Sequence, residues 1–157
     1  MSTIRERIVA AVVTALATNT PTGVPAPVRT RIDSPSADQL PALTVYQAAE
    51  TVEPMHDYKS GGRPMRGPVI RRSVQLNVEV ITAAGAGEEP DKAADPILAW
   101  ATKALGAAGT FDGLANHPAD EVGTKFEYEQ GETSFCRATL TFRIPFQSRA
   151  DDAEQVT

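Results

Sequence analysis

The segment SVQLNVEVITA (Ser73 to Ala83) decides the fold class of this chain. Its apolar and polar residues alternate strictly, so that Val74, Leu76, Val78 and Val80 share one face, opposite Ser73, Gln75, Asn77 and Glu79. A period of two predicts a strand with one face on a core and the other in solvent. We therefore expect a strand over residues 69 to 82 in an antiparallel sheet.

Further strands are predicted on both sides of this segment. Residues 28 to 32 fit a short strand, and residues 43 to 49 alternate with Leu43 and Val45 on one face. The chain closes with a hairpin over FEYEQGETSFCRATLTFRIPF (Phe126 to Phe146), whose turn lies around Gly131. Pro145 has no backbone N–H to donate, so the end of the return strand is expected at a sheet edge or outside the sheet.

Two amphipathic helices are predicted from spacing and capping signals. The first covers residues 3 to 18, where Thr3 and Glu6 have the spacing of a capping box. The second covers residues 95 to 107, with Asp95 as the N-cap, Pro96 at the first helical position and Trp100 at the edge of its apolar stripe.

The order of these elements predicts an α+β fold. We expect a two-layer sandwich, with a mostly antiparallel four- to five-stranded sheet and two helices packed on one face. Residues 1–148 are expected to form a single domain, followed by an acidic tail over residues 149–157. The Pro- and Gly-rich residues 53–68 are expected to form a long exposed loop.

The bulk composition excludes several classes of protein. The 157 residues carry a formal net charge of −5, which disfavours broad, non-specific binding to nucleic acid. The one cysteine, Cys136, cannot form an internal disulfide, and no secretory signal or membrane-spanning run is evident. We therefore expect a soluble protein that is made in the cytoplasm.

Candidates for catalysis or metal binding are few. His56 and His117 are far apart, and neither has a cysteine or second histidine at the spacing of a metal site. Cys136 shares its parity with Leu140 and Phe142, which predicts a buried thiol. We expect no enzymatic activity, no catalytic residue, no metal and no cofactor.

A basic segment is the most informative charge feature. Five cations fall within a stretch that holds no acid, namely Lys59, Arg63, Arg66, Arg71 and Arg72. Acidic residues gather instead on the closing hairpin, at Glu127, Glu129 and Glu132. These residues are candidates for contacts with an acidic partner subunit or with passing DNA. The alternative interpretation is a solvated loop and hairpin with ordinary surface charges.

The order of the elements, with the segments PALTVY (Pro41 to Tyr46) and ATLTFRI (Ala138 to Ile144), resembles the lambda-type phage tail terminators, the minor tail protein U family. The resemblance covers about residues 3 to 148. It implies a homohexameric ring in the virion that caps the tail tube at its head-proximal end. Its partners would be other copies of the chain, the tail tube protein and a head–tail connector or neck protein, with DNA passing through the lumen.

Two alternatives fit the same sequence. A head–tail connector or completion subunit could have a similar architecture. A small α+β ligand-binding protein or enzyme is the alternative from another class, and it predicts a concave pocket with convergent polar groups.

Overall fold

The computed structural model describes residues 2–30, 33–54, 69–85, 88–130 and 133–149. It contains one five-stranded mixed sheet with the order β1-β2-β3-β5-β4. The strands are β1 (Val28–Arg29), β2 (Ala42–Pro54), β3 (Val69–Ala84), β4 (Asp120–Glu129) and β5 (Ser134–Arg149). Only β1 pairs in parallel, with β2, and the other neighbours are antiparallel. The predicted α+β two-layer fold is confirmed.

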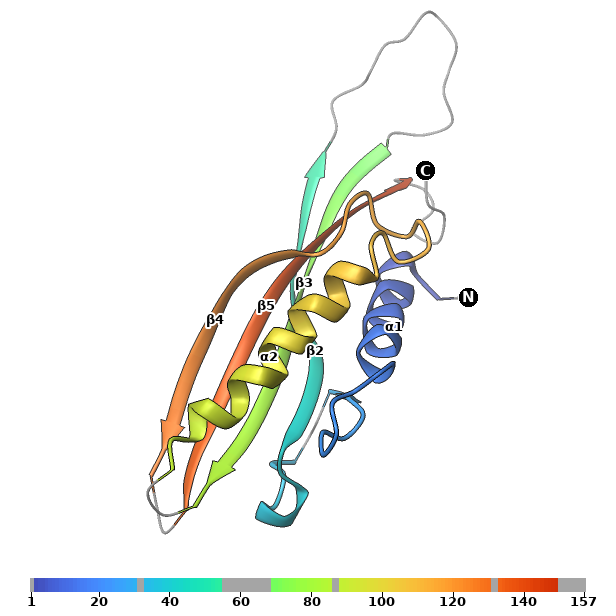
Figure 1. Ribbon diagram of the computed structural model, residues 1–157. Helices are drawn as coiled ribbons and strands as arrows, with labels where there is room; N and C mark the ends of the chain where they lie inside the picture. The colour runs from blue at the N-terminus through green and yellow to red at the C-terminus, as the bar shows by residue number, and fades with distance from the viewer. Residues whose placement is uncertain (1, 31–32, 55–68, 86–87, 131–132, 150–157) are drawn as a thin grey trace, which may run out of the picture.

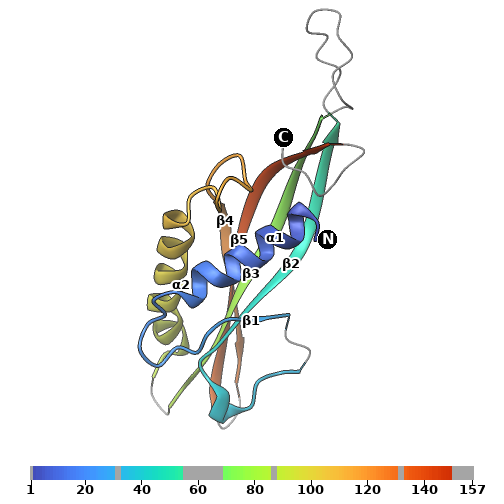
Figure 2. The same ribbon diagram turned by 90° about the vertical axis from the view of Figure 1, so that its right-hand side faces the viewer.

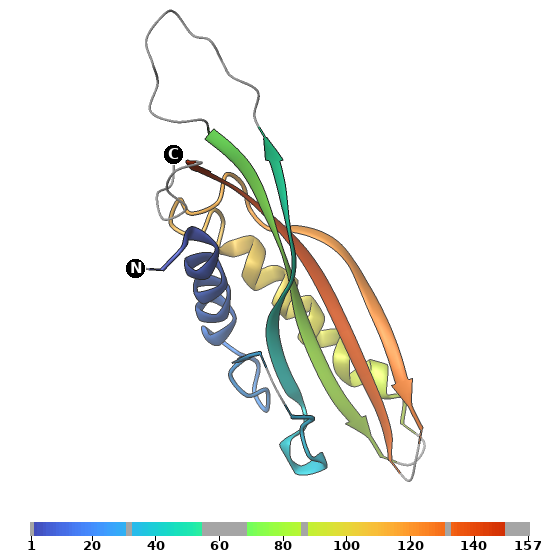
Figure 3. The ribbon, with the colours of Figure 1, turned by 180° about the vertical axis from the view of Figure 1, so that it is seen from behind.

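Both helices lie on the same face of the sheet (Figures 1 and 2). They are α1 (Ile4–Ala17) and α2 (Pro90–Ala107), and a short 3-10 helix, η1 (Ala37–Gln39), precedes β2. Seen from behind in Figure 3, the strands cross in front of α2. We call the two sides of the sheet the helix face and the open face.

The core lies between the helices and the helix face. It contains the predicted alternating sets of β3 and β5, including Val74, Leu76, Phe142 and Ile144, together with Ile8 and Leu16 of α1 and Ile97 and Leu105 of α2. Cys136 is fully buried in it, as predicted, and burial raises the pKa of its thiol. Trp100 packs against this core, and its indole N–H donates to the Asn19 carbonyl at 3.1 Å.

The start of α1 differs in part from the expectation. Thr3 Oγ1 accepts from the Glu6 backbone N–H at 3.3 Å, which is one half of a capping box. The Glu6 carboxylate does not complete the box but pairs with Arg29 of β1. The Thr3 side chain therefore caps the start of α1, while the Glu6 carboxylate links α1 to β1 through its ion pair with Arg29.

The predicted start of the second helix is wrong. α2 begins at Pro90 with Glu89 as its N-cap, and Pro96 lies inside the helix. Both prolines fit a first helical position by sequence, but Ala94 between them is fully buried and extends the packed face of α2. Packing of this extra turn outweighs the hydrogen bond lost at Pro96.

The strands are longer than the alternation alone predicted. β2 continues to Pro54 past a bulge near Ala48, and β5 continues to Arg149, where the acidic tail was expected to begin. Pro145 lies at a sheet edge, as expected, because β4 pairs with β5 only as far as Arg143. The Pro145 carbonyl accepts from the Asn116 N–H at 2.9 Å on the side that β4 has left. The predicted loop at 53–68 lies outside the described residues from position 55 onward.

Candidate assembly surfaces

The two described arginines of the basic segment lie on opposite faces of the sheet. Arg72 is a register neighbour of the buried Phe146, so it lies on the helix face. Arg71 alternates with it onto the open face, where it is exposed and stands beside Glu53 in the register. Lys59, Arg63 and Arg66 lie outside the described residues.

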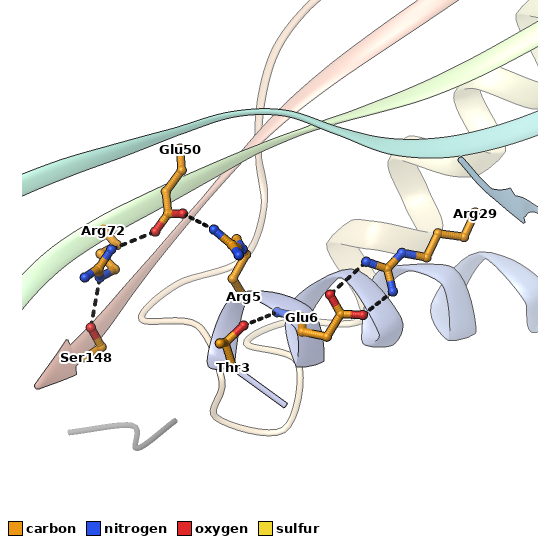
Figure 4. A network of polar contacts seen from close by, with 7 residues as sticks. All are labelled: Thr3, Arg5, Glu6, Arg29, Glu50, Arg72 and Ser148. Carbon is orange, nitrogen blue, oxygen red and sulfur yellow. Dashed lines mark hydrogen bonds and ion pairs between the residues drawn. The ribbon is translucent and has the colours of Figure 1, made fainter. Parts of the chain in front are cut away.

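Arg72 belongs to a polar network that joins α1 to the sheet (Figure 4). Its guanidinium donates to Glu50 Oε1 and to Ser148 Oγ, both at 3.0 Å. Arg5 of α1 donates to the second Glu50 oxygen at 2.7 Å. The side chains of Arg72 and Glu50 are only 23% and 16% exposed. The Arg72 side chain therefore bonds within the subunit, whereas the Arg71 side chain is exposed.

Glu50 is the centre of this network. Burial alone would raise the pKa of its carboxyl, but the hydrogen bonds and charges of Arg5 and Arg72 outweigh burial and hold the pKa below its ordinary value. The carboxylate thus stays ionised between two cations from distant parts of the chain. The sequence offered no signal for this cluster, because its members are far apart in sequence and come together only through pairing.

The acidic hairpin residues lie on an edge strand whose ten residues, Asp120 to Glu129, are all exposed. Glu127 and Glu129 are on the open face, and Glu127 accepts from Lys125 Nζ at 2.9 Å. This bond lowers the pKa of the Glu127 carboxyl. The third predicted acid, Glu132, lies outside the described residues.

Two apolar residues of β4, Phe126 and Tyr128, lie on the helix face beside the start of α2. Phe126 and Tyr128 are register neighbours of the buried Ala138 and Cys136. Phe126 is nevertheless 40% exposed and Tyr128 57% exposed. Partial burial and the nearby Asp91 carboxylate of α2 raise the pKa of Tyr128. The helix layer therefore leaves much of these two side chains exposed.

All exposed large hydrophobic side chains of the described residues lie on the two edges of the sheet. Val122, Phe126 and Tyr128 lie on β4 at one edge. At the other edge are Val28 on β1 and Val52 on β2, which are 44% and 47% exposed. Among the described residues, β1 pairs with β2 only at Thr44 and Val45, so within this part of the chain β2 forms a sheet edge beyond the bulge.

A shallow groove on the open face lies next to β4. It has a volume of about 380 Å³, and its lining includes Pro35, Leu40, Glu127 and Arg137. Arg137 pairs with Glu79 at 3.6 Å, so the guanidinium that lines the groove already has a partner within the sheet. Among the described residues, no three His, Cys, Asp or Glu side chains gather as they would around a metal ion. His117 is exposed, and His56 lies outside the described residues.

No helix in the described part of the chain has the length and apolar character needed to cross a membrane. No family model matches the chain, and no curated protein matches it in sequence.

Proposed function

We propose that this chain is a structural subunit of a phage tail, a terminator that assembles as a ring on the tail tube and ends its polymerisation. The proposal starts from the resemblance of residues 3 to 148 to the lambda-type tail terminators. It assigns the chain to the head-proximal end of the tail in the virion, with the tube protein on one side and a connector or neck protein on the other. It includes no catalytic residue, metal or cofactor.

The observation that supports the proposal best is the placement of exposed apolar side chains on both opposite edges of one sheet. Phe126 and Tyr128 lie two residues apart on one face of β4, and exposed apolar side chains that gather in this way commonly mark interaction sites. Two different surfaces on opposite sides suit heterologous association, in which each subunit uses one surface for each neighbour. Heterologous association closes into a ring when the rotation between subunits divides a full turn.

The two faces of the sheet also suit a ring that separates two partners. The helix face is covered by α1 and α2, whereas the open face presents polar side chains such as Gln75, Thr139 and Arg143. A terminator must bind the tube with one surface and the head side with another. A subunit with a helical layer and a polar sheet layer offers two surfaces of different chemistry.

The test is negative-stain electron microscopy of the purified full chain, alone and with tubes of the tail tube protein from the same genome. We expect rings with six-fold averages, and tubes that carry one ring at an end and stop growing. A preparation that stays monomeric or dimeric and leaves tube length unchanged would contradict the proposal. Rings that bind heads but leave tubes growing would favour the connector alternative.

A further inference from the structure

We propose that β4 of one subunit adds, antiparallel, to the outer edge of β2 in the next copy of the chain, with Phe126 opposite Val52 and Lys125 opposite Glu53. This inference deepens the proposed function and rests on its ring-forming part, because it names the two surfaces through which the ring would close. The contact would run from Thr124 to Glu129 on β4 and from Ala49 to Pro54 on β2, beyond the bulge.

The directions of β4 and β2 allow the two edges to pair as antiparallel strands. The strands β2, β3, β5 and β4 alternate in direction across the sheet, so β4 runs opposite to β2. A rotation about a ring axis carries strand directions and sheet faces from one subunit to the next. β4 therefore meets the neighbour's β2 as an antiparallel strand, and its unpaired N–H and C=O groups find partners there.

The apolar side chains favour the same pairing. Val52 is a register neighbour of Arg72, which places it on the helix face, and Phe126 lies on the helix face as well. Pairing the two edges brings Phe126 against Val52 and covers apolar surface that each subunit leaves open. An aromatic and a β-branched residue opposite each other form a stabilising cross-strand pair.

Charges on the open face select the register. With Phe126 opposite Val52, Lys125 stands opposite Glu53, whose other register neighbour is Arg71. The result is a row of alternating charges across the joined sheet. A shift that places Tyr128 opposite Val52 sets Glu127 against Glu53, and like charges directly opposite each other are destabilising. Of these two registers, the first therefore fits better.

The positions of the two paired segments along the sheet also bear on how the strands would be inclined to the ring axis. In Figure 1 the arrowhead of β2 is at the top of the sheet and that of β4 at the bottom. Joining them displaces each neighbour along the strand direction. Closed sheets accommodate such a stagger by tilting their strands relative to the axis, so the strands would be steeply inclined to the ring axis.

Disulfide trapping tests the pairing directly. The variant Phe126→Cys with Val52→Cys should form a ladder of covalent oligomers under oxidation that ends at the ring size. Both positions are exposed, so the substitutions should not disturb folding, and the native Cys136 is fully buried. In the matched control, Phe126→Cys with Thr51→Cys, the second cysteine points to the other face and should remain unlinked.

The single variant Phe126→Cys separates this pairing from a two-fold one. It should stay unlinked, whereas covalent dimers would overturn the inference in favour of a β4–β4 contact between two copies. Rings of the wild-type chain with no cross-links from the Phe126/Val52 cysteine pair would overturn the inference and leave the ring proposal standing. An open-ended cross-linked ladder without rings would support the pairing and contradict the capping role.

A charge exchange supplies an independent measure. Lys125→Glu should raise the concentration at half-assembly about tenfold, because it places two acids opposite each other. Adding Glu53→Lys in the same chain should restore assembly, whereas Lys103→Glu on α2 should leave it unchanged. Equal effects of Lys125→Glu and Lys103→Glu, or no rescue by Glu53→Lys, would contradict the register.

Discussion

Phe142 and Leu76 show how single residues determine the stability of the subunit. They are register neighbours on the helix face, and they are only 2% and 1% exposed. Phe142→Ala should lower the free energy of unfolding by about 3–5 kcal/mol and Leu76→Ala by about 2–5 kcal/mol, because each leaves a cavity in the core. Urea denaturation measures both values. The control Val122→Ala, at 59% exposure, should change stability by less than about 0.5 kcal/mol.

Glu50 is the second residue whose replacement should be costly. Glu50→Gln removes the only charge that Arg5 and Arg72 share in the network and should destabilise the subunit by about 1–3 kcal/mol. The matched variant Glu127→Gln loses only exposed charge contacts, with Lys125 and Arg137, and should change the urea midpoint little. Equal midpoints for the two variants would show that the network contributes no more than a surface pair.

The pH dependence of the Glu50 variant is a further check. Because the folded pKa of Glu50 lies below its ordinary value of 4.5, the unfolded chain takes up its proton first as the pH falls. Its stabilisation is therefore complete well above pH 4.5 and is lost as the pH falls through the lower, folded pKa. The stability difference between wild type and Glu50→Gln should shrink over that range, and a difference that grows in acid would contradict the assignment.

Among the elements, α2 carries a proline that should weaken it. Pro96 lies inside the helix, where its ring and its missing N–H disturb the preceding turn, and its side chain is exposed. Pro96→Ala should raise the free energy of unfolding by about 1–3 kcal/mol. Pro90→Ala is the control, because a proline at the first helical position costs no hydrogen bond. Stabilisation of equal size at both positions would show that α2 begins later than the structure indicates.

The elements also show how far the sequence predicts this fold. The apolar sets of β3 and β5 and both helices are predictable, because the alternation and helical spacing are local signals. The start of α2 was missed, since two prolines compete for the same role and tertiary packing of Ala94 decides between them. The exposure of β4 was not predictable, because it depends on strand order, and strand order comes from the long-range pairing of β3 with β5.

The candidate site was predicted only in part, for the same reason. The basic segment and the hairpin acids are visible as charges in the sequence, and Glu127 and Glu129 do lie on an exposed edge. Arg71 and Arg72 are consecutive residues of a strand, so the sequence alone predicts that they lie on opposite faces of the sheet. The partners of Arg72 do not follow from parity, because Glu50 and Ser148 reach it only through the pairing of β2 and β5 with β3.

For the whole molecule, the role of the basic segment in assembly can be tested with the Arg72 network left in place. Arg63, Arg66 and Arg71 should be replaced together by Ser, while Arg72 is kept because it holds the network with Glu50. If the segment contacts a neighbouring subunit, the tube or DNA, tails should be abnormal in length or should join heads more slowly. The control replaces Arg7, Lys92 and Lys103 by Ser. Tails of normal length that join heads at the normal rate would show that the segment is only a solvated surface.

The pairing of β3 with β5 has a consequence for the rate at which the chain reaches its native state. Val69 pairs with Arg149 and Ala84 with Ser134, so the middle of the sheet forms only after a loop containing α2 and β4 has closed. Such high contact order predicts slow folding, on the order of milliseconds to seconds. Amide hydrogen exchange should then be slowest in β3 and β5, which pair on both sides, and much faster in the edge strand β4. Exchange from β4 as slow as from β3 in the monomer would contradict this order.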